Sequence, residues 1–270
     1  MRFLYLLFIM VCFVSANTLL PPSDFLGYKL GDKFTPHHLV VDYLFHVLQN
    51  EPNVEIIEYG KTYEGRPLML AFISSVDNMD KLEQIRKDNL IRAGIIEGST
   101  KTKKVGIVWL SYNVHGNEAN STEAAMKTLH ALADKSNIKT QEWLKNTVVI
   151  IDPSVNPDGR DRYANWYRMT ANRWPDADPL GREHMEPWPG GRTNHYYFDL
   201  NRDWAWQTQI ESQLRIVKYN EWLPHIHVDF HEQGYNSPYF FAPAAKPLHQ
   251  YITDWQKDFQ KTIGLNHAKY

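Results

Sequence analysis

The sequence is almost without cysteine. Its one cysteine, Cys12, falls in an apolar N-terminal segment that we expect to be removed from the mature chain. A chain without thiols has no disulfide framework, no cysteine nucleophile and no thiolate zinc site. Any metal site in the mature chain therefore needs histidine or carboxylate ligands.

A strong charge of either sign is also lacking. The 29 basic and 31 acidic side chains leave a formal net charge of −2 over 270 residues. This balance gives no electrostatic footprint for nucleic acid or for a membrane surface. We expect neither to be a partner.

The chain begins with "MRFLYLLFIMVCFVSA", residues 1–16, which has one basic residue, an apolar core and small residues before Asn17. This pattern is typical of a secretory signal peptide and is short for a membrane span. The alternative is an uncleaved N-terminal anchor. The signal predicts a secreted or periplasmic protein without stable membrane association, whose mature part is residues 17–270.

Repeats, low-complexity tracts and Pro/Gly/Ser linkers are absent, so nothing divides the mature chain. Apolar strands that alternate with helices imply parallel pairing, covered on both faces. We predict an α/β fold with a mixed, largely parallel central sheet flanked by helices. The expected helices are at 35–52, 79–94, about 119–134 and about 205–220; the expected strands are an antiparallel pair at 54–60 and 68–74, then 105–112, 147–152 and 225–230.

The segment from Pro153 to about Tyr197 is dense in Trp, Tyr, Arg, Pro and Gly. We expect it to be one long loop. A loop of this length inside a compact domain is usually functional.

A first candidate site is "HGNE", residues 115–118, directly after the strand at 105–112. Ligands of open α/β sheets bind beyond the C-terminal ends of the strands. Gly116 permits a sharp turn, so His115 and Glu118 could face one point. The other interpretation is a surface turn, with a glutamate that the dipole of the next helix favours.

A second candidate is "HIHVDFHEQG", residues 225–234, which carries an apolar strand into a histidine. His225, His227, Asp229 and His231 alternate, so they project to one side of an ideal strand. His231 lies furthest toward the functional C-terminal end, which favours it as a ligand. His225 and His227 are interpreted as packing or hydrogen-bonded histidines.

Two ligands close in sequence, a distant third and an open fourth position are typical of catalytic zinc. Imidazole and carboxylate groups suit this ion. We therefore predict one Zn²⁺ held by His115, Glu118 and His231.

"FDLNRDW" places Asn201 beside Arg202 after the long segment. A guanidinium beside an amide is suited to grip a carboxylate. Asp199 could orient a zinc-bound imidazole from behind. The alternative for each residue is an ordinary surface ion pair.

These motifs together resemble the zinc carboxypeptidases of the carboxypeptidase A type. "YGKTYEGRPL" (59–68), "HGNE", "NPDG" (156–159), "DLNRDW" (199–204) and the strand-borne His231 occur in the family's order, and the resemblance runs from about Thr35 to Pro243. It implies that residues 17–270 are the N-terminal portion of a zinc-carboxypeptidase-like catalytic domain.

The resemblance also implies roles for single residues. His115, Glu118 and His231 would be the zinc ligands, and Asp199 would support His115. Asn201 and Arg202 would bind the carboxylate of the substrate.

The family further uses an arginine, between "NPDG" and "DLNR", to polarise the scissile carbonyl. Arg168 and Arg173 are the candidates, and the Trp-x-Arg setting favours Arg168.

The sequence departs from the family in two ways. The glutamate base on a late strand has no counterpart after His231, and Glu232 should point to the opposite face of its strand. We therefore expect the sequence to be a fragment, incomplete at the C-terminus and nearly inactive by itself. We also expect no folded inhibitory pro-domain, because fewer than about twenty residues lie between the predicted cleavage point and the first domain helix.

The leading hypothesis is a zinc metallocarboxypeptidase that removes C-terminal residues from peptides with a free carboxylate, using a metal-activated water and an arginine-stabilised oxyanion. One alternative is an amidohydrolase acting on cell-wall peptides or N-acyl amino acids. Another is a non-catalytic domain that binds carboxylates or peptides and lacks the base. A carbohydrate-binding module is suggested by nine Trp and fifteen Tyr but leaves the His and Glu positions unexplained.

Overall fold

The computed structural model describes residues 18–234, 236–237 and 242–269. The chain divides into two compact units, one through His231 and one from Glu232 onward. The first unit contains the sheet and the second contains helix α9 (Asp254–His267). The predicted signal peptide, residues 1–16, lies outside the described residues.

The first unit is built on a five-stranded sheet with the order β1-β2-β4-β3-β5. β2 pairs antiparallel with both β1 and β4, whereas β3 pairs parallel with β4 and β5. β2 therefore runs opposite to the other strands, and the predicted mixed α/β fold is confirmed. The strands are β1 (Val54–Lys61), β2 (Pro67–Ile73), β3 (Gly106–Tyr112), β4 (Thr147–Asp152) and β5 (Ile226–Phe230).

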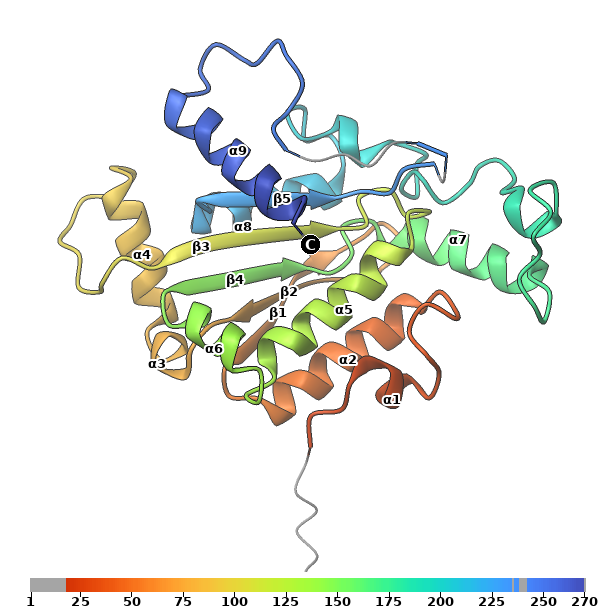
Figure 1. Ribbon diagram of the computed structural model, residues 1–270, viewed down its shortest axis with the longest axis horizontal. Helices are drawn as coiled ribbons and strands as arrows, with labels where there is room; N and C mark the ends of the chain where they lie inside the picture. Colours follow the sequence, from red (N-terminus) through yellow and green to blue (C-terminus); the bar gives the residue numbers. More distant parts are fainter. Residues whose placement is uncertain (1–17, 235, 238–241, 270) are drawn as a thin grey trace, which may run out of the picture. The chain divides into compact units, whose positions relative to one another are not determined.

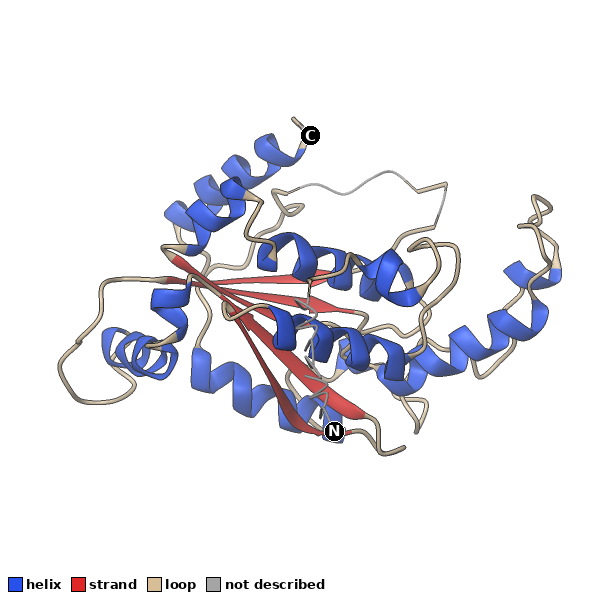
Figure 2. Ribbon diagram, turned by 90° about the horizontal axis from the view of Figure 1, so that it is seen from below, coloured by secondary structure: helices blue, strands red, loops and turns tan. Residues whose placement is uncertain are grey.

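Helices cover both faces of this sheet (Figures 1 and 2). α2 (His37–Asn50) and α5 (Asn120–Ala133) pack on one face, and α4 (Leu82–Arg92) and α8 (Ile210–Trp222) pack on the other. The shorter elements are α1 (Pro22–Leu26), α3 (Val76–Met79), α6 (Ile138–Leu144), η1 (Arg182–His184) and η2 (Leu200–Arg202).

The central strands are mostly apolar because each face of the sheet is buried. In β4, Val149 and Ile151 enter the core under α2 and α5, while Val148 and Ile150 enter the core under α4 and α8. Successive side chains of a strand point to opposite faces, so a strand between two helix layers needs apolar residues at every position. This is the pattern from which the sequence predicted parallel strands.

The prediction of one long loop after Pro153 is wrong. Residues Pro157–Thr170 form α7, which extends beyond the ends of β3 and β4 (Figure 1). Asn156 caps this helix, its side chain accepting a hydrogen bond from the backbone N–H of Gly159 at 2.9 Å, and Pro157 supplies a φ angle suited to the first turn. Asn156 and Pro157, which the sequence prediction placed in a loop, therefore start a helix.

The helix expected at about 205–220 starts later, at Ile210. The carboxylate of Asp203 accepts hydrogen bonds from the backbone N–H groups of Thr208 and Gln209, each at 2.9 Å. These bonds hold residues 203–209 in a turn. Within the described residues, no helix is both long and apolar enough to cross a membrane.

Candidate metal centre

The parallel strands bring the predicted site residues to one edge of the sheet. Tyr112 of β3 pairs with Phe230 of β5, and their rings stack with centroids 4.2 Å apart. His115 follows Tyr112 by three positions, and His231 directly follows Phe230. The two histidines therefore leave neighbouring strands at the same level, although they are far apart in the sequence.

Asn113 shapes the corner after β3. It adopts a φ angle of +62°, in the left-handed region that asparagine tolerates better than most residues. Its buried side-chain amide donates hydrogen bonds to the carbonyl oxygens of His115, Gly116 and Glu118, at 2.8, 3.2 and 3.0 Å. One side chain thus organises the whole "HGNE" turn.

Gly116 allows three backbone segments to meet at this corner. A Cβ atom at this position would lie 2.2 Å from the backbone nitrogen of Arg160 and 2.4 Å from the carbonyl oxygen of Gly191. A Cβ atom on Gly159 would lie 2.3 Å from that same oxygen. Gly116 and Gly159 are therefore required by close backbone contact.

The structure brings His115, Glu118 and His231 together. Nδ1 of His115 lies 2.8 Å from Oε1 of Glu118, and Nδ1 of His231 lies 3.2 Å from Oε2 of the same carboxylate. Ligand atoms of all three residues lie within 4.8 Å of one another. His115 is buried, whereas His231 is exposed, so the cluster faces solvent on one side.

This donor set fits zinc. Two imidazole nitrogens and one carboxylate are ligands that zinc takes in catalytic sites, where a fourth position remains open. Both imidazoles direct Nδ1 toward the carboxylate of Glu118, which leaves Nε2 of each ring for other partners. The three residues could therefore hold one ion through Nδ1 of each imidazole and the carboxylate of Glu118.

Asp199 lies beside His115. Its Oδ1 is 3.3 Å from Nε2 of His115. Burial acts to raise the pKa of Asp199, but the N–H of Asn201 and the charges of His115 and Arg192 outweigh it and hold the pKa below its ordinary value. The carboxylate is therefore ionised beside the ring that it would orient.

Asp229 lies behind His231 in a similar way. Its Oδ2 is 2.9 Å from Nε2 of His231. Hydrogen bonds with Asp229 and then Glu118 raise the pKa of His231 to about 10. The sequence analysis assigned no role to Asp229, although its i, i+2 spacing from His231 on a strand could have indicated one.

The two arginines that the sequence offered for the scissile carbonyl do not lie at the cluster. Arg168 and Arg173 line a different cavity, of about 500 Å³, with Tyr28 and Phe34. The arginine at the cluster is Arg192, which the sequence analysis missed. Its Nε and Nη2 each lie 3.1 Å from Oδ2 of Asp199, and its Nη1 lies 4.0 Å from Oε1 of Glu118.

Glu186 ties the segment before Arg192 to the "HGNE" corner. Its Oε2 accepts a hydrogen bond from the side-chain amide of Asn117 at 2.8 Å, and its Oε1 accepts one from the backbone N–H of Gly191. The position of Arg192 thus depends on the fold of this segment and not on a strand or helix. The signal available in the sequence was the glycine pair just before Arg192.

Asn201 and Arg202 follow Asp199 on the short helix η2. The side-chain oxygen of Asn201 accepts a hydrogen bond from Nε1 of Trp204 at 3.1 Å. The guanidinium of Arg202 donates to the backbone oxygen of Asn201 at 3.1 Å, and the residue is exposed. Both residues are thus connected to the cluster through the backbone of Asp199, two and three positions away.

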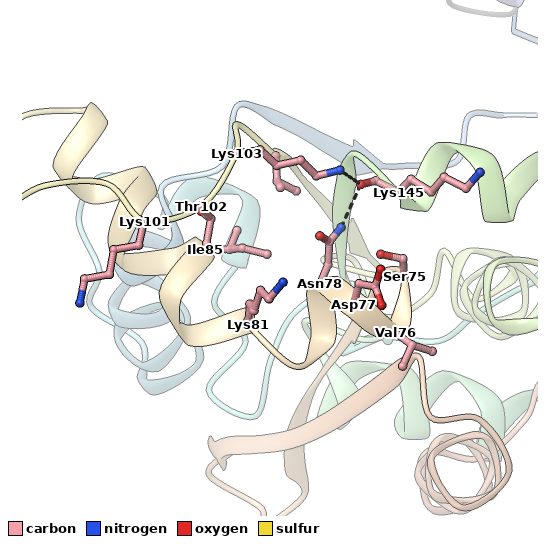
Figure 3. Close-up of a pocket in the computed structure, with 11 residues that line it drawn as sticks. Ser75, Val76, Asp77, Asn78, Lys81, Ile85, Lys101, Thr102, Lys103 and Lys145 are labelled. Carbon is pink, nitrogen blue, oxygen red and sulfur yellow. Dashed lines mark hydrogen bonds between the residues drawn. The ribbon is translucent and has the colours of Figure 1, made fainter.

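A lysine-rich cavity of about 570 Å³ lies at the other end of the strands, where β3 and β4 begin. The ammonium group of Lys103 donates to the backbone oxygen of Lys145 at 2.8 Å, and the side chains of Lys101 and Lys145 turn away from the cavity (Figure 3). Its cationic groups therefore do not converge on one point, unlike the groups of the His/Glu/His cluster.

Comparisons with known proteins show the family and the fold of the chain. A family model described as zinc carboxypeptidase matches residues 40–263. The fold is similar to that of a metallo-carboxypeptidase from Burkholderia cenocepacia, with 18% identity, a TM-score of 0.52, and coverage of 81% of this chain and 46% of that one. It is also similar to thrombin activatable fibrinolysis inhibitor, with 15% identity, a TM-score of 0.54, and coverage of 93% and 62%. The chain thus spans about half the length of these structures. No curated protein sequence matches it.

Proposed function

The chain belongs to the zinc carboxypeptidase family, and from this premise we propose that it supplies the zinc centre and carboxylate clamp of a metallocarboxypeptidase. Its substrate would be a peptide with a free C-terminal carboxylate, and its reaction would be hydrolysis of the last peptide bond. The observation that carries this proposal is the convergence of His115, Glu118 and His231 at one edge of the sheet.

The three residues of the cluster would hold one zinc ion. Zinc in such a site is a Lewis acid that supplies an activated water at neutral pH. Asp199 would hold Nε2 of His115, so that Nδ1 of this ring faces the ion. The protein itself holds the imidazole rings in the metal-binding orientation before the substrate binds.

Arg192 would stabilise the negative charge that develops on the scissile carbonyl oxygen. Its side chain is 44% exposed and lies within 4.0 Å of Glu118, so a substrate at the cluster can reach it. One preorganised donor of this kind contributes about 3–4 kcal/mol to transition-state stabilisation. We therefore replace Arg168 by Arg192 in this role.

Asn201 and Arg202 would bind the C-terminal carboxylate of the peptide. The exposed guanidinium of Arg202 and the neighbouring amide offer planar donors for a bidentate contact.

The apolar segment at residues 1–16 supports secretion, to the medium or to a periplasm, as a further part of the proposal.

Paired substrates test the reaction. The zinc-loaded chain is incubated separately with an N-acylated dipeptide that ends in a free carboxylate, with the C-terminal amide of that dipeptide, and with an N-acyl amino acid. Release of the last residue from the free acid alone supports a carboxypeptidase. Binding of the free acid without cleavage supports the carboxylate-binding domain instead, and cleavage of N-acyl amino acids in preference to dipeptides supports the amidohydrolase. Failure to bind any of them contradicts the proposal.

Arg192→Gln and Arg168→Gln form a matched pair that tests the reassigned arginine. The sequence lacks the family's glutamate base, so turnover by the wild-type chain should be slow; relative to that slow wild-type rate, we expect Arg192→Gln to lower kcat/KM by roughly 10²–10³-fold, as for the loss of one oxyanion donor. Arg168→Gln should leave kcat/KM within about twofold, because Arg168 lines a different cavity. The reverse ranking would restore Arg168 and exclude Arg192.

A further inference from the structure

Asp229 and Glu118 hold the imidazole of His231 at both of its nitrogens. Oδ2 of Asp229 lies 2.9 Å from Nε2, and Oε2 of Glu118 lies 3.2 Å from Nδ1. Asp229 and His231 are two positions apart at the end of β5, so the strand directs both side chains to the same side. The contact with Asp229 therefore follows from the strand itself.

The sheet sets the place of Asp229. It pairs with Ser111 of β3, and Ser111 pairs on its other side with Asp152 of β4. Asp229 thus belongs to a polar row that crosses the carboxyl ends of three parallel strands. Asp229 is the last residue but one of β5, an edge strand of the described sheet, and its pairing with β3 restrains it more than a loop would.

Asp229 is held at an energetic cost. Its side chain is only 22% exposed, and its Oδ1 is buried without a hydrogen-bond partner among the described residues. A carboxylate in such surroundings is unfavourable unless it is paired. Its other oxygen, Oδ2, contacts the ring of His231. This contact therefore offsets the cost of burying the carboxylate.

Each histidine of the cluster has a carboxylate beside its Nε2. Nε2 of His115 lies 3.3 Å from Oδ1 of Asp199 without a hydrogen bond, whereas Nε2 of His231 is hydrogen-bonded to Oδ2 of Asp229 at 2.9 Å. A ring nitrogen that donates to a carboxylate leaves the other nitrogen free of its proton and able to bind a metal. Asp199 comes from η2 and Asp229 comes from β5, so the two arrangements are built independently.

We propose that Asp229 is a positioning residue, which fixes the ring of His231 so that Nδ1 is presented to the metal ion. This inference rests on the proposed zinc site and adds to it a second carboxylate–histidine pair. Asp229 acts through His231 and contacts neither the substrate nor the ion.

Zinc affinity tests this role directly. The dissociation constant is measured by competition with a chromogenic chelator for the wild type, Asp229→Asn and Asp229→Ala, with Asp32→Asn as the exposed control. We expect Asp229→Ala to bind zinc about 10- to 100-fold more weakly, in the range for lost outer-sphere carboxylates. Asp229→Asn should lose less, because its amide oxygen still accepts from Nε2, and the control should match the wild type.

Urea unfolding of the zinc-free variants separates positioning from folding. We expect Asp229→Asn to keep the zinc-free midpoint of the wild type while its zinc affinity falls. Wild-type zinc affinity in both Asp229 variants would overturn the inference and leave the proposed function standing. A wild-type chain that binds no zinc would overturn the proposed function itself.

Discussion

The buried ion pair between Arg160 and Glu123 offers a quantitative test of how the corner is supported. Arg160 is fully buried, and its Nη2 lies 2.6 Å from Oε1 of Glu123. The same guanidinium donates to the backbone oxygens of Ala119, at 2.6 Å, and Thr35, at 3.0 and 3.1 Å. Arg160 therefore connects the start of α7 with the start of α5 and with the chain before α2.

Arg160→Met would remove this connection and leave Glu123 without its cation. The Glu123 carboxylate would keep the backbone N–H and the hydroxyl of Thr35, at 2.7 and 2.8 Å, but its charge would be unpaired in the interior. Breaking a buried pair by removal of one partner costs about 3–5 kcal/mol. We expect the free energy of unfolding to fall by about 4 kcal/mol, since two carbonyl oxygens also lose their donor.

A double-mutant cycle in urea, followed by tryptophan fluorescence, measures this effect. Arg160→Met with Glu123→Gln should be less destabilising than the sum of the single changes by about 2 kcal/mol, because no buried charge remains unpaired. The exposed Arg182→Met serves as control and should stay within about 0.5 kcal/mol of the wild type. A cost below about 1 kcal/mol for Arg160→Met, or strict additivity, would refute the reasoning.

Two further predictions concern the corner and the buried end of β4. Gly116→Ala should cost about 1–3 kcal/mol in urea unfolding, because its methyl group would overlap backbone atoms; Gly106→Ala meets its nearest atom at an ordinary 3.6 Å and should be much milder. Equal effects would show that the contact at the corner is unimportant. Burial raises the pKa of Asp152 to about 7, so the neutral carboxyl group is favoured in the folded state. Its stabilising contribution is fully present below the unfolded pKa of about 4 and is lost as the pH rises to about 7, a change on the order of 4 kcal/mol. Asp152→Asn should lack this decrease between about pH 4 and 7, and a constant difference from the wild type would contradict the assignment.

The sequence predicted the sheet well because its strands carry an unambiguous pattern. Continuous apolar runs between helices predicted parallel pairing, and parallel pairing places the ends of β3 and β5 side by side. The meeting of His115 with His231 could be predicted for this reason alone. Asp199 could be placed near His115 through the family resemblance, and its contact was found at 3.3 Å.

The misses have a common physical cause. α7 was predicted as a loop because Asn156 and Pro157 suit both a turn and a helix start, and only the packing of Gly159 against the corner decides between them. Arg192 was missed because Glu186 and Gly191 place it through contacts between loops, which leave no periodic pattern. Sequence spacing predicts the side chains whose positions are set by strands. Side chains that are placed by contacts between loops can be located only in the three-dimensional structure.

The central claim is that three residues from two strand ends bind one metal ion. Its most direct test is the zinc content of the purified chain after dialysis, measured by inductively coupled plasma mass spectrometry. We expect one zinc per chain in the wild type and in His227→Gln, whose ring lies 3.0 Å from Ser111 and not at the cluster. His115→Ala and His231→Ala should each lose the metal, and retention of one zinc by both would contradict the account.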